Sequence, residues 1–331
     1  MSTTDQLLIT GASGFLGRAI AAQAEADGVA VRCTGRTPNP SPLLPNYHSA
    51  DLTNGDCVDG LFDSVTQVIH SAGLAHQFGN QDDIADRFQR VNVDATRNVA
   101  TAAARAGVEQ FVLVSSVSVY GTQTNSPVPD DAPCHPVGPY AESKWQAEQV
   151  AMEIADQAGM RLTILRMATI YGEQDPGNVL KLVQAIDSGR FVWIGRGRNM
   201  KSLIHVDDAG RACLQAALFC PADTSDTRPR IFNVSAVPES MHTIVQSIGH
   251  SLGQPVRGWH VPAALPLAVT NIAGRIIPGG RVVRRLHGTI HKWLANDEYD
   301  GSRFAKEYDF SPSINLSDGI EREVAWYRKA A

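Results

Sequence analysis

The sequence lacks the features that several classes of protein require. Its formal net charge is −5, which argues against a general affinity for nucleic acid. Its five cysteines include no Cys-x-x-Cys pair, a usage typical of reduced thiols in a cytoplasmic protein. Neither an internal repeat nor a low-complexity segment is present, so solenoid and tail-like architectures are not indicated.

Long hydrophobic runs are also missing. The most apolar stretch, 261–277, is interrupted by two prolines, an asparagine and an arginine, and falls short of the roughly 20 residues that a membrane span needs. Residues 1–5 form a short polar tail, and no signal peptide precedes Leu7. We therefore expect no membrane span and a cytoplasmic location.

The most informative segment is a glycine-rich turn near the N-terminus. Residues 6–10 predict a short buried strand, and 15–26 predict an alanine-rich helix, so the run TGASGFLG lies between them. Glycines there let the backbone approach a dinucleotide pyrophosphate, which the helix N-terminus attracts. The spacing is G-x-x-G-x-x-G, and an ordinary glycine turn is the alternative. The residues expected to contact the cofactor are Gly11, Ser13, Gly14, Phe15, Leu16 and Gly17.

A second motif, YAESK at 140–144, lies far downstream. Tyr140 and Lys144 are four residues apart, so on a helix they share one face. A tyrosine hydroxyl has a pKa near 10, which a nearby ammonium and an oxidised nicotinamide would both lower. Tyr140 can then exchange a proton with an alcohol, with Ser116 hydrogen-bonded to the same oxygen. The alternative is a solvated surface helix.

Strands alternate with helices over the first half of the chain. This alternation predicts a doubly wound parallel sheet with helices on both faces, an α/β Rossmann fold. Ligands in such sheets bind beyond the carboxyl ends of the strands. Besides the first strand and helix, the predicted strands are 29–34, 65–71, 111–115 and 162–167, and the predicted helices are 85–106 and 140–157.

After residue 172 the pattern changes. A loop leads to a predicted helix at 179–188, and the apolar piece 231–235 predicts a strand that rejoins the sheet. The length of 331 residues suits two domains of about 150 residues each. We predict a Rossmann domain over 1–172, rejoined by 203–236, and a smaller, discontinuous α/β substrate domain over 173–202 and 237–331.

These pieces together resemble the extended short-chain dehydrogenase/reductases, in the branch of sugar-nucleotide epimerases, dehydratases and reductases. The matching pieces also include HSAG, VNVDATRNV, VSSVSVYG, LRMATIYG and LIHVDDAGRA. The resemblance implies that Ser116, Tyr140 and Lys144 are catalytic, that Lys144 also holds the nicotinamide ribose, and that helices 85–106 and 140–157 form a homodimer. Further implied cofactor contacts are Asp51, Leu52, Ser71, Ala72, Gly73, Asn92, Ser115 and Met167.

The end of the second predicted strand bears on the choice of cofactor. NAD enzymes usually place an acid there to bind the ribose hydroxyls, whereas this chain has Gly35 followed by Arg36. An arginine can pair with a 2′-phosphate and stack on adenine. We expect NAD or NADP as cofactor, with NADP favoured. The alternative role of Arg36 is stacking on the adenine of NAD.

Positions 117 and 118 narrow the reaction. In relatives that dehydrate sugars, the residues at positions 116–118 resemble a Thr-Asp-Glu pattern, whose carboxylates act as acid and base. This chain has Ser116-Val117-Ser118, which offers no carboxylate for elimination chemistry. We expect a 4-epimerase or 4-ketoreductase of a nucleotide-linked sugar. Two alternatives stay open. One is an NADP(H)-dependent reductase of a bulky apolar alcohol or ketone, with Trp259 and 261–277 lining its pocket, and the other is a non-catalytic NADP-sensing protein.

Substrate contacts are expected from Ser118, Asn178 and Lys201, the last two by resemblance to residues that contact the nucleotide diphosphate. Relatives usually have arginine followed by aspartate at the second position, so Lys201-Ser202 departs from the pattern. Relatives usually have a second arginine near the C-terminus, and this chain has no clear match for it. Arg281, Arg284 and Arg285 could take its place. The alternative is that these three arginines only form a solvated basic face.

One cluster could suggest a metal site. His205, Asp207 and Asp208 lie close together in the sequence, and all three side chains belong to types that bind metals. A fourth ligand and a recognised spacing are both missing. We therefore expect a structural role for these residues and no metal.

Overall fold

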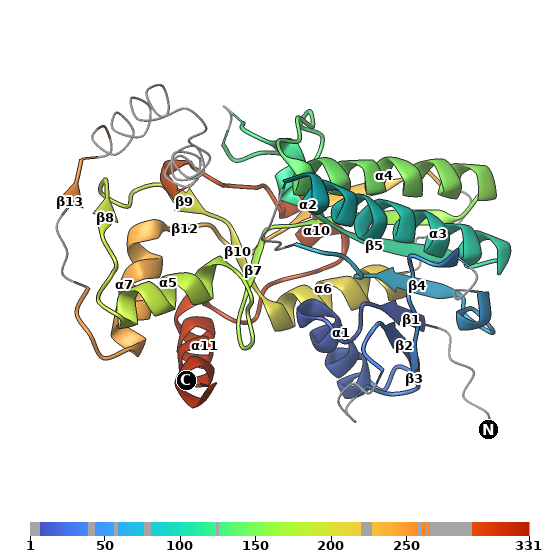
Figure 1. Cartoon of the computed structure of the whole chain (residues 1–331), viewed down its shortest axis with the longest axis horizontal. Coiled ribbons are helices and arrows are strands. Elements are labelled where there is room, and N and C mark those ends of the chain that lie inside the picture. The colour runs from blue at the N-terminus through green and yellow to red at the C-terminus, as the bar shows by residue number, and fades with distance from the viewer. Residues whose placement is uncertain are drawn as a thin grey trace. The chain divides into compact units, whose positions relative to one another are not determined.

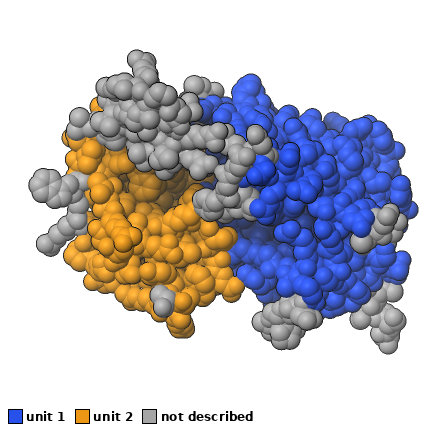
Figure 2. All heavy atoms as spheres, in the orientation of Figure 1, with its two compact units in different colours: residues 1–170, 204–236, 299–313 blue, residues 171–203, 237–298, 314–331 orange. Residues whose placement is uncertain are grey.

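The structure, a computed structural model, describes residues 7–38, 44–55, 59–75, 81–123, 126–219, 227–256, 260–262, 264 and 293–330. The chain divides into two compact units, coloured separately in Figure 2. Unit 1 comprises residues 1–170, 204–236 and 299–313, and unit 2 comprises residues 171–203, 237–298 and 314–331. Each unit is therefore assembled from separate stretches of sequence.

Unit 1 is built on a seven-stranded sheet with the order β11-β6-β5-β4-β1-β2-β3. All six strand pairings in it are parallel, and the order reverses beside β1. The predicted doubly wound parallel sheet is confirmed. Its strands are β1 (Leu7–Thr10), β2 (Val31–Gly35), β3 (Tyr47–Ser49), β4 (Gln67–His70), β5 (Gln110–Ser116), β6 (Arg161–Met167) and β11 (Arg230–Val234).

Helices cover both faces of this sheet (Figure 1). One face carries α2 (Gln81–Phe88), α3 (Ala95–Arg105) and α4 (Pro139–Ala158), and the other carries α1 (Phe15–Ala26) and α6 (Val206–Leu218). The helix expected over 85–106 begins at Gln81, and its middle, Gln89–Asp94, is a π-helix. Apolar spacing does not reveal such a turn, because it changes the backbone pairing and leaves the residue types unaltered.

Strands covered on both faces need apolar side chains pointing both ways. Leu7 and Ile9 enter the core that also contains residues of α1 and α6, whereas Leu8, between them, enters the core that contains residues of α3 and α4. All three side chains are fully buried. The continuous apolar run at the start of the chain is thus explained by the period of two along a strand.

Unit 2 has its own apolar core around Trp193, which is 2% exposed. In the described part of the chain, no helix is both long and apolar enough to cross a membrane. The elements of unit 2 are α5 (Asn178–Asp187), α7 (Met241–Ser251), α11 (Leu316–Ala330) and the paired strands β8 (Trp193–Ile194) with β13 (His260–Val261) and β9 (Met200–Lys201) with β12 (Glu239–Ser240).

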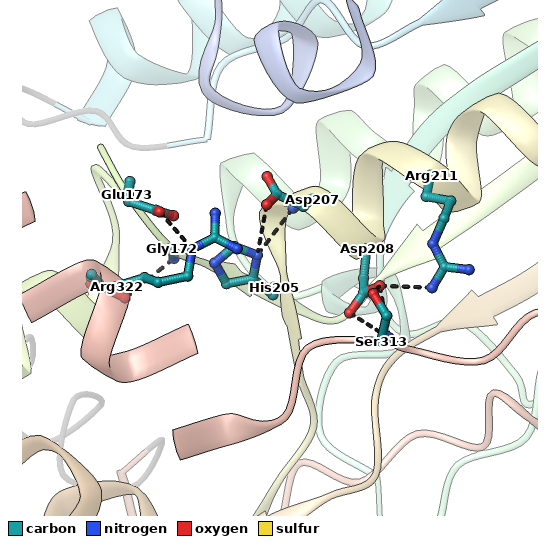
Figure 3. Close-up of polar contacts among 9 residues, drawn as sticks. Gly172, Glu173, His205, Asp207, Asp208, Arg211, Ser313 and Arg322 are labelled. Carbon is teal, nitrogen blue, oxygen red and sulfur yellow. Dashed lines mark hydrogen bonds and ion pairs between the residues drawn. The ribbon is translucent and has the colours of Figure 1, made fainter. Parts of the chain in front are cut away.

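A buried carboxyl group ties α11 to the loop before α5. Oε2 of Glu323 accepts a hydrogen bond from the Gly172 amide at 3.2 Å, and the neighbouring Arg322 pairs with Glu173 at 2.7 Å (Figure 3). Burial raises the pKa of Glu323 to about 8, and the nearby Asp175 carboxylate adds to this effect. Glu323 therefore holds a proton in the folded protein over much of the neutral range.

We predict that Glu323→Gln stabilises the protein at alkaline pH, because glutamine has the shape of the protonated acid. The pKa of Glu323 is about 8 in the folded protein against an ordinary value of 4.5, so the stability that its proton contributes is full below pH 4.5 and is lost as the pH rises to about 8. In that window the free energy of unfolding of the wild type should fall, relative to the variant, by about 1.4 kcal/mol per pH unit. Urea unfolding of both proteins across this range measures the difference, and a difference independent of pH would contradict the prediction.

Candidate active site

The glycine-rich turn lies between β1 and α1, at the carboxyl end of the sheet. Gly11 has a φ of +68°, and a Cβ on it would lie 2.6 Å from the Ala72 backbone, so only glycine fits. A Cβ on Gly17 would collide with the carbonyl oxygen of Gly11. At the start of α1, Gly14 provides no side-chain cap, which leaves the first-turn N–H groups available to an anion. The turn therefore fits a pyrophosphate.

A chain of hydrogen bonds joins the ends of β1 and β4 beside this turn. Thr10 Oγ1 lies 2.7 Å from His70 Nδ1, His70 Nε2 lies 3.0 Å from Thr96 Oγ1, and Thr96 donates to the Asn92 carbonyl at 2.6 Å. Because Thr96 uses its one proton on Asn92, it accepts from Nε2–H, and Nδ1 accepts from Thr10. His70 is therefore neutral, and burial lowers its pKa to about 3.

Asn92 connects the loop after β4 to α4. Its side chain accepts a hydrogen bond from the Leu74 amide at 2.7 Å and donates to the Leu74 carbonyl at 3.1 Å and to Ser143 Oγ at 2.9 Å. The π-helix positions Asn92 for all three contacts, as such turns often do at functional sites. Asn92 thus holds the segment that contains the predicted cofactor residues Ser71, Ala72 and Gly73.

Ser116, Tyr140 and Lys144 are brought together in unit 1. Ser116 ends β5, and its Oγ accepts a hydrogen bond from the Ser118 amide at 3.2 Å and is hydrogen-bonded to Tyr140. Lys144 lies one turn further along α4, and its Nζ donates to the Val114 carbonyl on β5 at 2.6 Å. The three residues that the sequence selects therefore meet where β5 and α4 pack together.

The electrostatics of this trio suit proton exchange. Burial raises the pKa of Tyr140, and its hydrogen bond with Ser116 opposes that rise. Burial lowers the pKa of Lys144 to about 8, and the Glu148 carboxylate opposes that fall. A phenolate forming on Tyr140 would be stabilised by the ammonium of Lys144 on the same helical face. The arrangement can therefore take a proton from a hydroxyl group or return one to a carbonyl oxygen.

Ser118 lies two residues after Ser116, within the 3₁₀ turn Val117–Tyr120. Its Oγ is buried and makes no hydrogen bond to the part of the chain that the structure describes. Buried hydroxyl groups almost always have a partner, so this one has a donor and an acceptor to offer to a ligand. The sequence-based prediction that Ser118 contacts substrate remains a prediction with this support.

Arg36 is exposed just beyond the end of β2, near Asp51. Hydrogen bonds from Thr53 hold the pKa of Asp51 below its ordinary value, and the Arg36 guanidinium adds a smaller effect. Gly35, the last residue of β2, stands where NAD enzymes usually carry an acid. The predicted adenine end of the site thus combines an exposed guanidinium with a nearby carboxylate.

Of the two predicted substrate residues of unit 2, Lys201 is buried and Asn178 is exposed. Lys201 lies on β9, and its Nζ pairs with the Asp297 carboxylate at 2.5 Å. Asn178 is the first residue of α5. Their contact with substrate remains a prediction, in which Lys201 would share its ammonium with Asp297. Outside the described residues lie Trp259, most of 261–277, and Arg281, Arg284 and Arg285.

His205, Asp207 and Asp208 have structural contacts within unit 1 (Figure 3). His205 Nδ1 accepts a hydrogen bond from the Asp207 amide at 3.2 Å. Asp208 pairs with Arg211 at 2.7 Å and accepts from the amide and hydroxyl of Ser313 at 2.9 Å and 2.8 Å. Within the described ranges, no group of three histidine, cysteine or acidic side chains could hold a metal ion.

Two buried charged residues lie beside the site and were not predicted from the sequence. Glu148 on α4 and Arg166 on β6 form an ion pair in which Nη2 and Oε2 are 2.7 Å apart, with side chains 0% and 3% exposed. Ser115, expected to contact the cofactor, donates its hydroxyl to Glu148 at 2.5 Å. The available signals were the spacing of Glu148, four residues after Lys144, and an arginine inside the apolar strand LTILRM.

Comparison with known proteins agrees with this geometry. The model of the NAD dependent epimerase/dehydratase family matches residues 7–235. The chain belongs to this family. It is therefore an enzyme of the extended short-chain dehydrogenase/reductase type, and the family supports NAD or NADP as its cofactor. The resemblance drawn from the sequence motifs is confirmed.

Similar proteins include two full-length relatives. N-acetyl-alpha-D-glucosaminyl-diphospho-ditrans,octacis-undecaprenol 4-epimerase from Escherichia coli O157:H7 is 27% identical over 97% of this chain and 95% of its own length. dTDP-glucose 4,6-dehydratase from Streptomyces griseus is 26% identical over 98% of this chain and 95% of its own length. The epimerase/dehydratase relatives therefore cover the chain from end to end and include more than one reaction.

Solved structures with the same fold include MoeE5 in complex with UDP-glucuronic acid and NAD. It has a TM-score of 0.74 at 23% identity and covers 98% of this chain and 100% of its own. The NAD complex of UDP-glucose 4-epimerase from Thermus thermophilus has a TM-score of 0.74 at 19% identity, with the same coverage. At these identities the similarity establishes the fold.

We predict that Tyr140→Phe abolishes turnover and leaves nucleotide binding nearly intact. The hydroxyl moves the proton, whereas the glycine-rich turn holds the pyrophosphate. General acid–base help of this kind contributes about 10² to 10⁴ in rate. Turnover assays with the proposed substrates, together with cofactor titration followed by fluorescence, test both parts. A variant with wild-type turnover would disprove the role of Tyr140.

Arg36→Ala should weaken binding of NADP(H) more than that of NAD(H), because a 2′-phosphate would lose its cationic partner. A charge-assisted hydrogen bond contributes about 1.5–3 kcal/mol, or roughly tenfold to a hundredfold in affinity. Titrating both cofactors against both proteins gives the four affinities required. Equal losses for the two cofactors would mean that Arg36 only stacks on adenine, and NAD would then be the better assignment.

Proposed function

We propose that the protein is a 4-epimerase or 4-ketoreductase of a nucleotide-linked sugar that works through Ser116, Tyr140 and Lys144. The observation that carries this proposal is the meeting of those three side chains at the end of β5, with Ser116 hydrogen-bonded to Tyr140 and Lys144 to the Val114 carbonyl. Both relatives described above are named for reactions at C4 of a diphosphate-linked sugar, which supports the same reacting carbon.

In this proposal the chain's own residues bind one hydroxyl group and move its proton. Ser116 Oγ accepts from the Ser118 amide and is hydrogen-bonded to Tyr140, and in this proposal its O–H turns to donate to the sugar oxygen when substrate binds. Tyr140 takes the proton of the C4 hydroxyl as the carbonyl group forms, and returns a proton when that carbonyl is reduced. Tyr140 is a phenolate before it takes that proton and again after it returns it, and the protonated Lys144 stabilises this charged form; while the carbonyl group is present, Tyr140 holds the proton.

NAD or NADP, bound at the glycine-rich turn, would supply the hydride acceptor and donor for this exchange. The residues that would hold it are those of the turn itself, with Arg36 and Asp51 at the adenine end and Ser71 to Gly73 beside the turn. NADP remains the favoured cofactor in this proposal because Arg36 is exposed and Gly35 stands where NAD enzymes usually carry an acid.

A dehydratase is the reaction that the site supports less well. Elimination needs a carboxyl group to act as general acid or base beside the sugar, whereas the two residues after Ser116 are Val117 and Ser118. Ser118 instead offers a buried hydroxyl with no hydrogen-bond partner in the described part of the chain. A neutral donor and acceptor suits binding of a sugar hydroxyl rather than proton abstraction from carbon.

A second candidate differs only in the carrier of the sugar. The Escherichia coli relative is named for a sugar linked through diphosphate to undecaprenol, and it matches this chain along almost its whole length. Where nucleotide-binding relatives usually have an arginine, this chain has Lys201, whose charge is balanced by Asp297. Since both carriers present a diphosphate to this position, the match to that relative over almost the whole chain is what favours this candidate.

The expected outcome with UDP-N-acetylhexosamines is interconversion of the C4 epimers with no net change in absorbance of the reduced nicotinamide, because an epimerase returns its hydride. A ketoreductase would instead consume NAD(P)H steadily with 4-keto sugar nucleotides. Parallel assays contain the same sugars linked to undecaprenyl diphosphate, and Tyr140→Phe is the matched inactive control. Activity only on the polyprenyl substrate would establish the second candidate. Activity only on a bulky apolar ketone would overturn both.

A further inference from the structure

A buried ion pair lies directly behind the proposed catalytic residues. Tyr140, Lys144 and Glu148 are spaced four residues apart along α4, so they line one face of the helix. The carboxylate of Glu148 accepts from Arg166 Nε at 3.1 Å and from Nη2 at 2.7 Å, a bidentate arrangement. Neither side chain has a role in the proton transfer described above.

This pair reaches β5 on the residue before the catalytic serine. Ser115 donates its hydroxyl to Oε1 of Glu148, while Lys144 donates to the carbonyl of Val114. Two successive turns of α4 therefore hold two successive residues of β5, and the next residue is Ser116. Glu148 therefore contacts the residue next to Ser116 directly, and its carboxylate opposes the loss of the proton of Lys144.

Arg166 is in turn fixed on its far side. Its Nη1 donates to the Asp130 carbonyl at 3.2 Å, and its guanidinium lies 4.8 Å from the ring centroid of Tyr120. Tyr120 donates to Asn233 at 2.7 Å. The arginine is thus held by three elements, which orients the carboxylate of Glu148 without help from solvent.

We propose that Glu148, held by Arg166, is a positioning residue of the active site that keeps the buried Lys144 protonated and fixes the end of β5. This inference rests on the proposed Ser116, Tyr140 and Lys144 site. A buried ammonium needs a nearby negative charge, and Glu148 is the neighbour that supplies it one helical turn away. Without that charge Lys144 would lose its proton at a lower pH, and Tyr140 would lose the cation that stabilises its phenolate.

The other groups around Lys144 do not supply this charge. His70 on β4 is neutral, because its pKa is about 3, and Tyr140 is protonated at rest. Beyond Arg166, burial raises the pKa of Tyr120 to about 12 and that of Cys134 to about 11, so both are neutral. The remaining neighbours of Arg166 include Asp130, whose pKa burial raises to about 6. Asp130 therefore changes charge on the acid side of neutrality, away from the range in which Lys144 titrates.

The test compares pH profiles of turnover. Glu148→Gln leaves Arg166 buried and unpaired, so the double variant Glu148→Gln/Arg166→Gln removes the pair as a unit. We expect the alkaline limb of the profile to move to lower pH by about 1 unit or more in Glu148→Gln, since a nearby opposite charge typically shifts a pKa by roughly 1–3 units. The shift should have the same direction but be smaller in the double variant, which removes a positive charge together with the negative one. Glu153→Gln, which removes the same charge from an exposed position on α4, should leave the profile unchanged. Asp130→Asn should leave the alkaline limb in place.

A readout independent of activity accompanies the profile. The rate at which acetic anhydride labels Lys144, followed by mass spectrometry across pH, gives the pKa of that amine directly. The pKa of the Lys144 amine should fall in Glu148→Gln and in the double variant. Glu148→Asp keeps the charge, so its pKa shift should be smaller. A folded Glu148→Gln variant, or a folded double variant, with a wild-type profile and labelling curve would overturn the inference. Full activity of Tyr140→Phe would instead disprove the proposed site, and the labelling result would still stand on its own.

Discussion

The packing of α4 against the end of β5 is the contact on which the rest of the site depends. Lys144 donates to the Val114 carbonyl and Glu148 accepts from Ser115, so the helix holds the strand at two consecutive residues. The parallel sheet places this strand end on the same edge as the turn after β1. Proton transfer and cofactor binding can therefore share one edge of unit 1, although their residues come from distant parts of the sequence.

Burying charge at such a place is costly, and the structure shows how the cost is offset. An ion taken out of water is tolerated when it is paired and hydrogen-bonded. Arg166 and Glu148 satisfy each other with two hydrogen bonds, and Ser115 and the Asp130 carbonyl take further positions. Burial favours the neutral amine of Lys144, and the Glu148 carboxylate opposes this effect, which favours an ammonium close to Tyr140. That combination is what a proton exchange near neutral pH requires.

Beside the glycine-rich turn, the buried polar groups are neutral and are joined by hydrogen bonds. The chain from Thr10 through His70 and Thr96 to Asn92 has one consistent direction of donation, so each group is satisfied without a net charge. Asn92 then connects this chain to the loop after β4 and to α4. The end of β1, the loop after β4 and α4 are consequently parts of one hydrogen-bonded framework, in a chain whose relatives are named for more than one reaction.

The sequence by itself determined the parallel sheet, the glycine turn and the proposed Ser116, Tyr140 and Lys144 set, because apolar period and local spacing carry that information. Only the tertiary structure decided the partners of buried charges. Arg166 meets Glu148 across 18 positions, and Lys201 meets Asp297 across 96, distances at which no local pattern indicates a pairing. The π-helix that positions Asn92 also required the folded chain, since tertiary contacts rather than residue types select it. Local rules therefore predict the elements, whereas charge compensation depends on which elements finally pack together.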